Sequence, residues 1–280
     1  RIQQALGEDI LTYNQRLKTI ANIELKDIKN HHRRTHTLKN MRFVVAGKLT
    51  GRKAAIKEQL EGWQLEPGER FEIPHDEAHK ANPVLIRRKE ATNLTFGWSM
   101  IAPRELTDEE SDAMGALNHI LTGTMSSKIF GAARKRGLAY SIFSDTSVGF
   151  YDSAWDFGGQ VNLETAEKLF DIIVRELKRV LSGTVSAEDL ENAKSYALGR
   201  YQMGAQTVGQ ISNFYTNRYF SDDFVKDYNG VPAAILAVTP EQMIETARQF
   251  FAANTWTLAA VSSDDKELLL KLYDKLSKLF

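Results

Sequence analysis

Apolar residues repeat at helical spacing in several parts of the chain. Between Glu164 and Leu181, apolar residues at 169, 170, 173, 174, 177, 180 and 181 fall on one side of a helix. A stripe of this kind is typical of a helix that packs one face against a core. Gly183 follows the stripe and predicts where the helix ends. We therefore expect an amphipathic helix over residues 164–181.

Further helices are indicated by the residues at which they begin. Thr107-Asp-Glu-Glu110 is a capping box, in which the Thr hydroxyl and the Glu carboxylate each satisfy a backbone N–H at the helix start. Ser186-Ala-Glu-Asp189 is a near relative of this motif. Thr239-Pro-Glu-Gln242 places a proline at the first helical position, where its missing N–H costs nothing. A helix is expected from each of these points onward.

Strands are predicted where short segments rich in β-branched and aromatic residues alternate apolar with polar or small positions. These segments are residues 42–46, 93–101, 140–144, 152–161 and 256–261. The fourth follows the third closely enough to form a hairpin with it, and Gly158-Gly159 predicts a bulge or a close approach there. Residues 66–83 contain three prolines and several charges, which indicates a linker plus an edge strand.

The order of elements repeats along the chain. A predicted helix, strand and helix begin near Leu25 and again near Thr239, with Asn40 and Asn254 in equivalent places before the two strands. Such a repeat predicts an α+β fold of two similar units, of which the first is incomplete. We expect residues 1–66 to be the tail of a first domain, 67–81 a linker and 82–280 a complete second domain. The chain opens inside a helical pattern without Met, so a processed or truncated product is expected.

The composition excludes several classes of partner and site. Lys plus Arg and Asp plus Glu both number 36, so the chain has no net charge with which to attract nucleic acid. No apolar run approaches the ~20 residues that span a bilayer, so no transmembrane segment is expected. The lack of cysteine excludes disulfides, a thiol nucleophile and Cys-bound metal, and it suits the cytoplasm or another reducing compartment.

The histidines do not form a known zinc motif. His32 and His36 lie four residues apart in a predicted helix, but two arginines and no carboxylate stand between them. His75 and His79 have Glu77 midway, whereas zinc peptidases place the Glu next to one of the two histidines. We expect both pairs to be surface groups. Nucleophile-elbow, phosphate-binding and dinucleotide-binding motifs are also missing, so neither a self-sufficient catalytic constellation nor a metal site is predicted.

One stretch of the chain resembles a known signature. Residues 120–144 include Ser126-Ser-Lys-Ile-Phe130 and Gly137-Leu-Ala-Tyr140. This stretch resembles the second-domain signature of the pitrilysin/insulinase-type zinc metallopeptidases (inverzincins) and the mitochondrial processing peptidases. Weaker likenesses at residues 40–47, 186–194 and 237–242 extend the resemblance over most of the chain.

The resemblance implies a fold and a division of labour. Each half of such an enzyme has two similar α/β domains of the LuxS/processing-peptidase type, with an antiparallel-rich sheet and helices packed on one face. Two halves enclose a peptide, and zinc is bound by His-x-x-Glu-His and a further Glu in the catalytic half. This chain has no such motif. The resemblance therefore implies zinc bound outside this chain, a complementary His-x-x-Glu-His-bearing domain or subunit, and no activity of the chain alone.

The resemblance also implies two residues that bind substrate. An Arg and a Tyr of this signature hold the peptide backbone near the cleaved bond, and Tyr140 matches the tyrosine. The family arginine stands seven residues before the tyrosine, where this chain has Ala133, and Arg134 stands six before it. We assign substrate binding to Tyr140 and Arg134, with Arg136 as a further candidate for the arginine. The alternative for Tyr140 is a half-buried strand residue that touches no substrate.

Three functions fit these observations. The first is the substrate-binding, non-zinc-binding portion of a pitrilysin-type metalloendopeptidase that degrades or processes peptides. The second is a non-catalytic structural subunit, like the core subunits of a respiratory complex that share this fold, and the shifted arginine favours it slightly. The third is a free peptide-binding module that uses an exposed sheet edge for β-augmentation.

Overall fold

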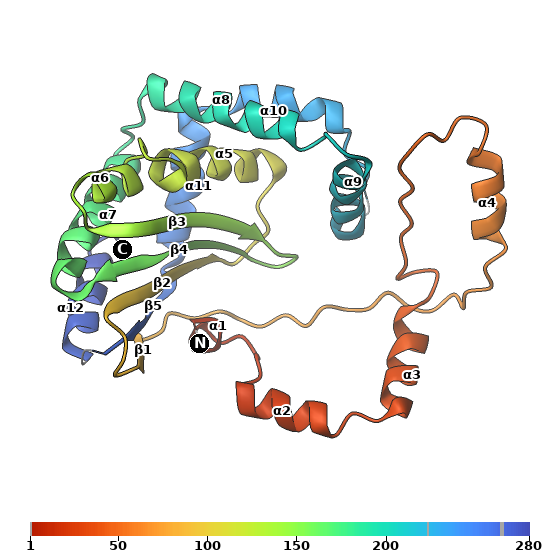
Figure 1. The fold of residues 1–280 in the computed structure, drawn as a ribbon, viewed down its shortest axis with the longest axis horizontal. Coiled ribbons are helices and arrows are strands. Elements are labelled where there is room, and N and C mark those ends of the chain that lie inside the picture. The colour runs from red at the N-terminus through yellow and green to blue at the C-terminus, as the bar shows by residue number, and fades with distance from the viewer. Residues whose placement is uncertain (1, 223, 264–265) are drawn as a thin grey trace. The chain divides into compact units, whose positions relative to one another are not determined.

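The computed structural model describes residues 2–222, 224–263 and 266–280 (Figure 1). The chain forms two compact units. The first unit comprises Arg1–Asp9, Asp76–Gly199 and Pro232–Phe280, and the second comprises Ile10–His75 and Arg200–Val231. The domain division expected from the sequence, with a linker over residues 67–81, stays a prediction.

A five-stranded sheet forms the centre of the first unit. Its strand order is β1 (Val84–Arg87), β5 (Thr255–Ser262), β2 (Asn93–Ala102), β4 (Ser153–Asn162) and β3 (Ala139–Val148). β1 runs parallel to β5, and all other neighbours are antiparallel. The four longer strands confirm their predictions, including the hairpin of β3 with β4. The edge strand β1 begins directly after Pro83 rather than within residues 66–83, because prolines remove backbone donors that a ladder needs.

One face of this sheet is buried. On β2, alternate residues from Leu94 to Met100 point into the core, as one face of a strand requires. Trp155 of β4 and Trp256 of β5 both stand opposite Met100, so they lie on the same face, and both are fully buried. Trp98 stacks on a phenylalanine of β4 beside them. The core is therefore built from aromatic rings on three adjacent strands.

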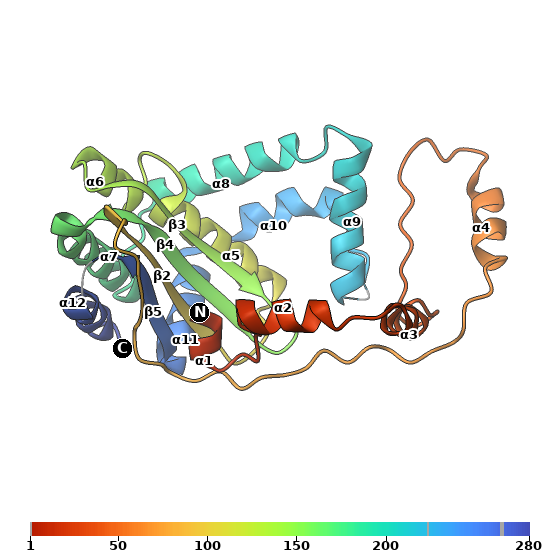
Figure 2. The ribbon, with the colours of Figure 1, turned by 60° about the horizontal axis from the view of Figure 1, so that its bottom comes forward.

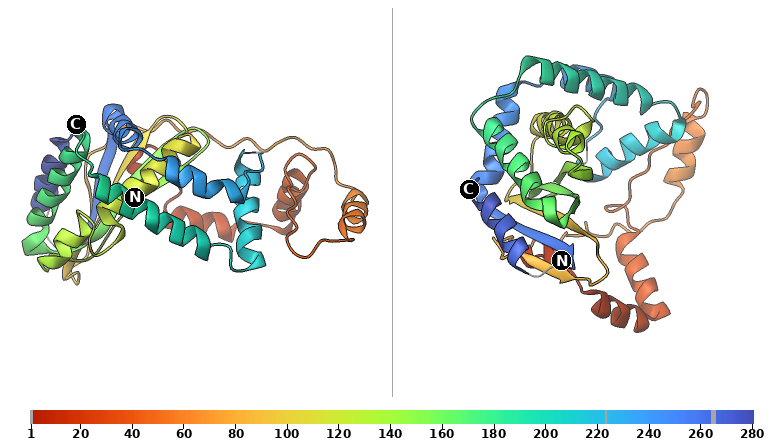
Figure 3. Two further views of the ribbon diagram at one scale, coloured as in Figure 1. Left: turned by 90° about the horizontal axis from the view of Figure 1, so that it is seen from above. Right: turned by 60° about the vertical axis from the view of Figure 1, so that its left-hand side comes forward.

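Helices cover the buried face (Figure 2). Two helices contact the edge strand β3: α5 (Asp108–Asn118) and α6 (Phe130–Lys135). α7 (Ala166–Leu181) contacts β4, and α11 (Pro240–Ala253) contacts β2. α12 (Lys266–Ser277) packs on α7, and the remaining helices of this layer are α8 (Ala187–Met203) and α10 (Val231–Ala237). The short α1 (Ile2–Leu6) lies on the opposite face, where a side chain at Gly97 would collide with Ile2. Figure 3 shows this layering from two further sides. An α+β fold with a mostly antiparallel sheet and its main helices on one face confirms the predicted fold class.

The helix boundaries follow the caps that the sequence predicts. Thr107 and Thr239 each accept a hydrogen bond from the third helical N–H, and both capping boxes are complete. α7 follows a 3-10 turn (Leu163–Thr165) and ends just before Gly183, whose φ is +90°. The helix predicted after the last strand, over residues 265–279, is α12, and residue 265 lies outside the described residues.

The second unit consists of helices and extended segments in its described residues. Its helices are α2 (Tyr13–Ala21), α3 (Leu25–Thr35), α4 (Lys53–Glu61) and α9 (Val208–Asp222), with a 3-10 turn at Tyr228–Gly230. The strand predicted over residues 42–46 is wrong, because these residues form no ladder. The helices predicted on both sides of it are present as α3 and α4.

Side-chain competition explains the missing strand. The backbone N–H groups of Leu38 and Lys39, in the turn before this segment, bond to the carbonyls of Glu66 and Pro67. At Asn40 the side chain takes over, and its amide donates to the Glu69 carbonyl at 2.7 Å. Polar side chains that bond the neighbouring backbone compete with strand pairing, and Pro67 offers no N–H. The segment therefore stays extended without becoming a strand.

Glu110 joins the cap of α5 to an ion pair. Arg104 donates to both carboxylate oxygens of Glu110, at 2.8 and 2.6 Å, and the Thr107 N–H donates to one of them at 2.9 Å. The bonds from Arg104, followed by the bond from Thr107, lower the pKa of Glu110. Glu110 therefore stabilises the fold at every pH at which its carboxyl group is ionised.

We expect Glu110→Gln to lower the free energy of unfolding at neutral pH by about 1–2 kcal/mol, because it removes charge-assisted bonds. The contribution of the carboxylate is complete above its ordinary pKa of 4.5 and is lost as the pH falls through the lower value in the folded state. Urea titrations of the two proteins should therefore converge in acid. A stability difference that does not change with pH would contradict this account.

Candidate functional site

Tyr140 stands at an irregularity of the edge strand β3. Ala139 pairs with Val161 of β4 and Ser141 pairs with the adjacent Gln160, so Tyr140 is the extra residue of a β-bulge. The Tyr140 side chain is 77% exposed, while Ala139 beside it is buried. Bulges of this kind often redirect a side chain next to a functional site. Here the bulge directs the phenol into solvent.

The helix before β3 ends in a tight C-terminal motif. Gly137 adopts a φ of +65°, its N–H bonds to the carbonyl of Arg134, and the Leu138 N–H bonds to the carbonyl of Ala133, both at 3.0 Å. This is the Schellman arrangement, which requires a residue in the left-handed region and therefore favours glycine. It reverses the chain within a few residues and brings the last turn of α6 next to the start of β3.

Arg134 and Tyr140 lie together at this turn. The Cζ atom of Arg134 lies 5.0 Å from the centroid of the Tyr140 ring. A cation–π contact at an exposed site contributes about 0.5–1 kcal/mol, which is enough to favour one arrangement of the two side chains. Among the cations that the structure describes, Arg134 is the one placed over this ring, whereas Arg136 is the C-cap residue of α6. Ala133, in the register of the family arginine, is fully buried in the core.

A polar network holds β3 against the end of α5. The hydroxyl oxygen of Thr122, in the turn after α5, accepts the Ser144 N–H at 2.9 Å and lies 2.8 Å from the Ser144 hydroxyl. Asn118 accepts a hydrogen bond from the Trp155 indole at 2.8 Å and donates to the Thr146 hydroxyl at 3.0 Å. Both residues are buried. The network therefore ties the strand that carries Tyr140 to the helix layer and to the core.

Sequence reasoning does not find this network. Asn118 lies outside the signature stretch, the resemblance gives Thr122 no role, and their partners on β3 are more than twenty residues away along the chain. A signal does exist on β3, where Ser144 and Thr146 are polar at alternate positions that face the helices. Small hydroxyl residues at such positions indicate polar partners on the covering layer.

Side chains already cap part of the outer edge of β3. The Ser144 N–H is bonded by Thr122, and the Thr146 N–H bonds to the Asp145 carboxylate at 2.9 Å. Residues two apart on a strand direct their N–H groups to the same side. Two successive donors on one side of β3 are thus bonded to side chains rather than to β4. Edges protected in this way resist the addition of another strand.

His119 opens the π-helical turn His119–Gly123 that follows α5. Its ring stacks on Tyr196 of α8, with the two centroids 4.0 Å apart, and burial lowers the pKa of His119. The Nδ1 atom is buried and has no hydrogen-bond partner in the part of the chain that the structure describes. A side chain at Gly123 would collide with this ring, so the glycine is required for the packing. The neutral imidazole is a packing element between the turn and α8.

The histidine pairs belong to other segments of the chain. His32 and His36 stack on each other with centroids 4.0 Å apart at the end of α3, and His79 packs beside Gly7 in an extended segment. Within residues 2–222, 224–263 and 266–280, no three His, Asp or Glu side chains come together as ligands of one metal ion. A zinc ion of the kind that the resemblance implies therefore has no donor set among these residues.

Carboxyl groups gather on the face of the sheet that the main helices leave open. Asp156 of β4 alternates with the buried aromatic residues and so points to this face. Burial raises the pKa of Asp156. Burial, followed by the charges of Asp152 and Asp76, likewise raises the pKa of Glu8. Several carboxyl groups therefore lie near one another on this face.

Residues 22–196 match the family described as the peptidase M16 inactive domain. An uncharacterized zinc protease of Streptomyces coelicolor is 30% identical over 168 residues, which cover 59% of this chain and 36% of that protein. The non-peptidase homolog YmxG of Helicobacter pylori is 24% identical over 271 residues, which cover 89% of this chain and 58% of that protein. The chain thus spans less than two thirds of each of these relatives.

A chain of complex III from Candida albicans has a similar fold. The TM-score is 0.76 at 12% sequence identity, and the match covers 94% of this chain and 64% of that chain. At this identity the likeness concerns the fold alone. None of the helices within the described residues is long and apolar enough to cross a membrane.

We expect Thr122→Val to loosen the edge strand β3. Valine keeps the shape of threonine but leaves the Ser144 N–H without its acceptor, which costs about 1–3 kcal/mol for a buried donor. Urea unfolding should show this loss, and hydrogen exchange of the Ser144 amide should become faster. Thr122→Ser keeps the hydroxyl and is the matched control. Unchanged exchange in Thr122→Val would show that β3 does not depend on the network.

Proposed function

Because the chain belongs to the peptidase M16 inactive-domain family, we propose that it is the substrate-holding portion of an M16-type zinc metallopeptidase. In this proposal it helps a complementary His-x-x-Glu-His-bearing domain or subunit to enclose a peptide, and it holds the backbone that this partner cleaves. The relative named as a zinc protease supports the proposal. We further propose that the chain is inactive alone and works in the cytoplasm or another reducing compartment, since it lacks cysteine.

The exposed pair of Arg134 and Tyr140 is the observation that carries this proposal. A phenol at a strand bulge can donate its O–H to a peptide carbonyl as negative charge builds on that oxygen. A guanidinium beside it can donate to a second carbonyl of an extended backbone. Within the described residues, the cation–π contact at 5.0 Å is the interaction that holds the two side chains, and neither makes an ion pair or a side-chain hydrogen bond. The pair is thus available to a ligand without loss of core packing.

The zinc ion belongs to the partner in this proposal. When bound there, zinc lowers the pKa of a coordinated water and polarises the carbonyl to be cleaved. The residues of this chain contribute orientation and hydrogen bonds: Tyr140 and Arg134 hold the backbone, and the network of Thr122 and Asn118 keeps β3 in place.

A structural subunit is the second candidate function. The relative named as a non-peptidase homolog and the likeness to a complex III chain favour it, as does Ala133 in the register of the family arginine. In that case Arg134 and Tyr140 would form a surface contact without touching a peptide. The two candidates differ in what the phenol does.

A free peptide-binding module is the least favoured of the three. β-Augmentation needs a row of available backbone donors along a sheet edge. On β3 the N–H groups of Ser144 and Thr146 are already bonded to side chains, and β1 at the other edge has only four residues. Saturable binding of a peptide to this chain without any partner would restore this candidate.

We expect Tyr140→Phe to lower kcat/KM of the assembled enzyme by about 100-fold, because the ring stays but the donor to the developing oxyanion is lost. Activity is measured on an unstructured peptide with the chain and its His-x-x-Glu-His-bearing partner combined. Tyr13→Phe, at a tyrosine that is 71% exposed on α2, is the matched control and should leave kcat/KM unchanged. Full activity of Tyr140→Phe would favour the structural subunit.

A further inference from the structure

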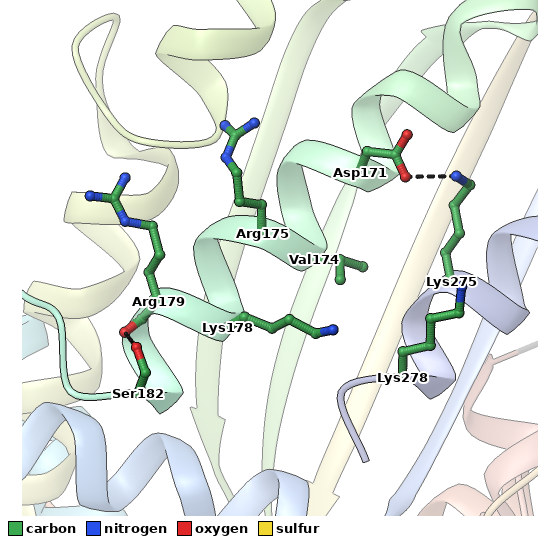
Figure 4. Close-up of a pocket in the computed structure, with 8 residues that line it drawn as sticks. All are labelled: Asp171, Val174, Arg175, Lys178, Arg179, Ser182, Lys275 and Lys278. Carbon is green, nitrogen blue, oxygen red and sulfur yellow. Dashed lines mark hydrogen bonds and ion pairs between the residues drawn. The ribbon is translucent and has the colours of Figure 1, made fainter.

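A groove lined by cations lies on the outer helix layer, between α7 and α12 (Figure 4). It has a volume of about 580 Å³ and is open along one side. Five of its eight lining residues are cationic: Arg175, Lys178, Arg179, Lys275 and Lys278. Both helices belong to the first unit, so the groove is part of one compact body. We refer to it as the α7–α12 groove.

Three of the five cations already have carboxylate partners. Lys275 bonds to Asp171 at 2.6 Å, and Arg175 and Arg179 share Glu176, at 2.7 and 3.5 Å. Glu176 itself is buried. These pairs fix the walls of the groove and cancel most of their own charge.

The two remaining cations give the groove its net charge. Lys178 and Lys278 have no carboxylate within salt-bridge distance among the residues that the structure describes. Figure 4 shows the Lys178 chain reaching across from α7 toward α12. The chain as a whole has no net charge, so this local surplus is not a consequence of a basic protein.

The negative end of α7 does not account for this surplus. Cations commonly gather near the C-terminus of a helix because they neutralise its dipole. In this protein Arg248 of α11 already does so, with its guanidinium donating to the Leu181 carbonyl at 2.6 and 3.2 Å. Lys178 is therefore not needed for that purpose.

We propose that the α7–α12 groove docks an acidic segment of another polypeptide, whose carboxylates bind Lys178 and Lys278. The groove extends along α7 from Asp171 to Ser182, roughly 16 Å at 1.5 Å per residue, which suits a short run of extended chain. Small-molecule sites enclose most of their ligand, and an open groove does not. Val174 and the methylene stems of the lysines offer an apolar floor for such a segment. This inference is independent of the role proposed for Tyr140.

Fluorescence anisotropy of the full chain with a labelled glutamate–glycine repeat peptide tests the proposal. Binding should saturate and should weaken roughly tenfold when salt is raised to about 300 mM, because the contacts are between charges. Combined charge reversal, Lys178→Glu with Lys278→Glu, should weaken binding by at least about tenfold. The peptide with serine in place of glutamate should not bind.

A matched double variant on the same helices tests whether the acidic peptide binds in the groove or is attracted to positive charge anywhere on the surface. Lys168→Glu with Lys266→Glu makes the same charge change on α7 and α12 at exposed residues outside the groove. This variant should bind the acidic peptide like the parent, and circular dichroism should report both variants folded. An equal loss of peptide binding in both double variants would overturn the proposal. Failure of the acidic peptide to bind, while tripolyphosphate or vesicles rich in phosphatidylserine bind, would overturn it as well.

Discussion

Burial of one face of the sheet is the constraint on which the rest of the molecule depends. Trp98, Trp155 and Trp256 are enclosed there, and by area each contributes about 4–6 kcal/mol, an upper estimate. The indole N–H of Trp155 bonds to Asn118 at the end of α5, whereas that of Trp98 has no hydrogen-bond partner among the described residues. The Asn118 amide also bonds to Thr146 of β3. Core packing and the position of the strand that carries Tyr140 are therefore fixed together.

Features set by local rules could be predicted from the sequence. The apolar stripe predicted α7, and the capping residues predicted the starts of α5 and α11. The alternation of apolar and polar residues predicted β2, β4 and β5. The strand predicted over residues 42–46 does not form, because the Asn40 side chain bonds the neighbouring backbone and Pro67 of that neighbour has no N–H to donate.

The candidate site was predictable only in part. Tyr140 followed from the resemblance, but the position of Arg134 depends on the Schellman turn at Gly137, which spacing alone cannot place. Asn118 and Thr122 act through contacts far apart in sequence. Polar contacts of this kind follow no sequence periodicity and no sequence motif. They can therefore be identified only once the pairing of the strands is known.

The charges of the first unit are segregated although the chain is neutral overall. Carboxyl groups such as Asp156 and Glu8 occupy the open face of the sheet, and burial there raises the pKa of both. Lys178 and Lys278, which have no carboxylate partner among the described residues, occupy the α7–α12 groove on the helix layer. Two surfaces of opposite charge suit two different partners.

Photo-crosslinking at position 140 tests the central claim most directly. Tyr140 is replaced by photoreactive benzoylphenylalanine in the assembled enzyme, with the same probe at Tyr13 as the reference. A peptide-holding role predicts a cross-link from position 140 to an unstructured peptide, suppressed by unlabelled peptide and missing from position 13. A cross-link from position 140 to the partner protein alone would contradict the account and identify the pair with Arg134 as an architectural contact.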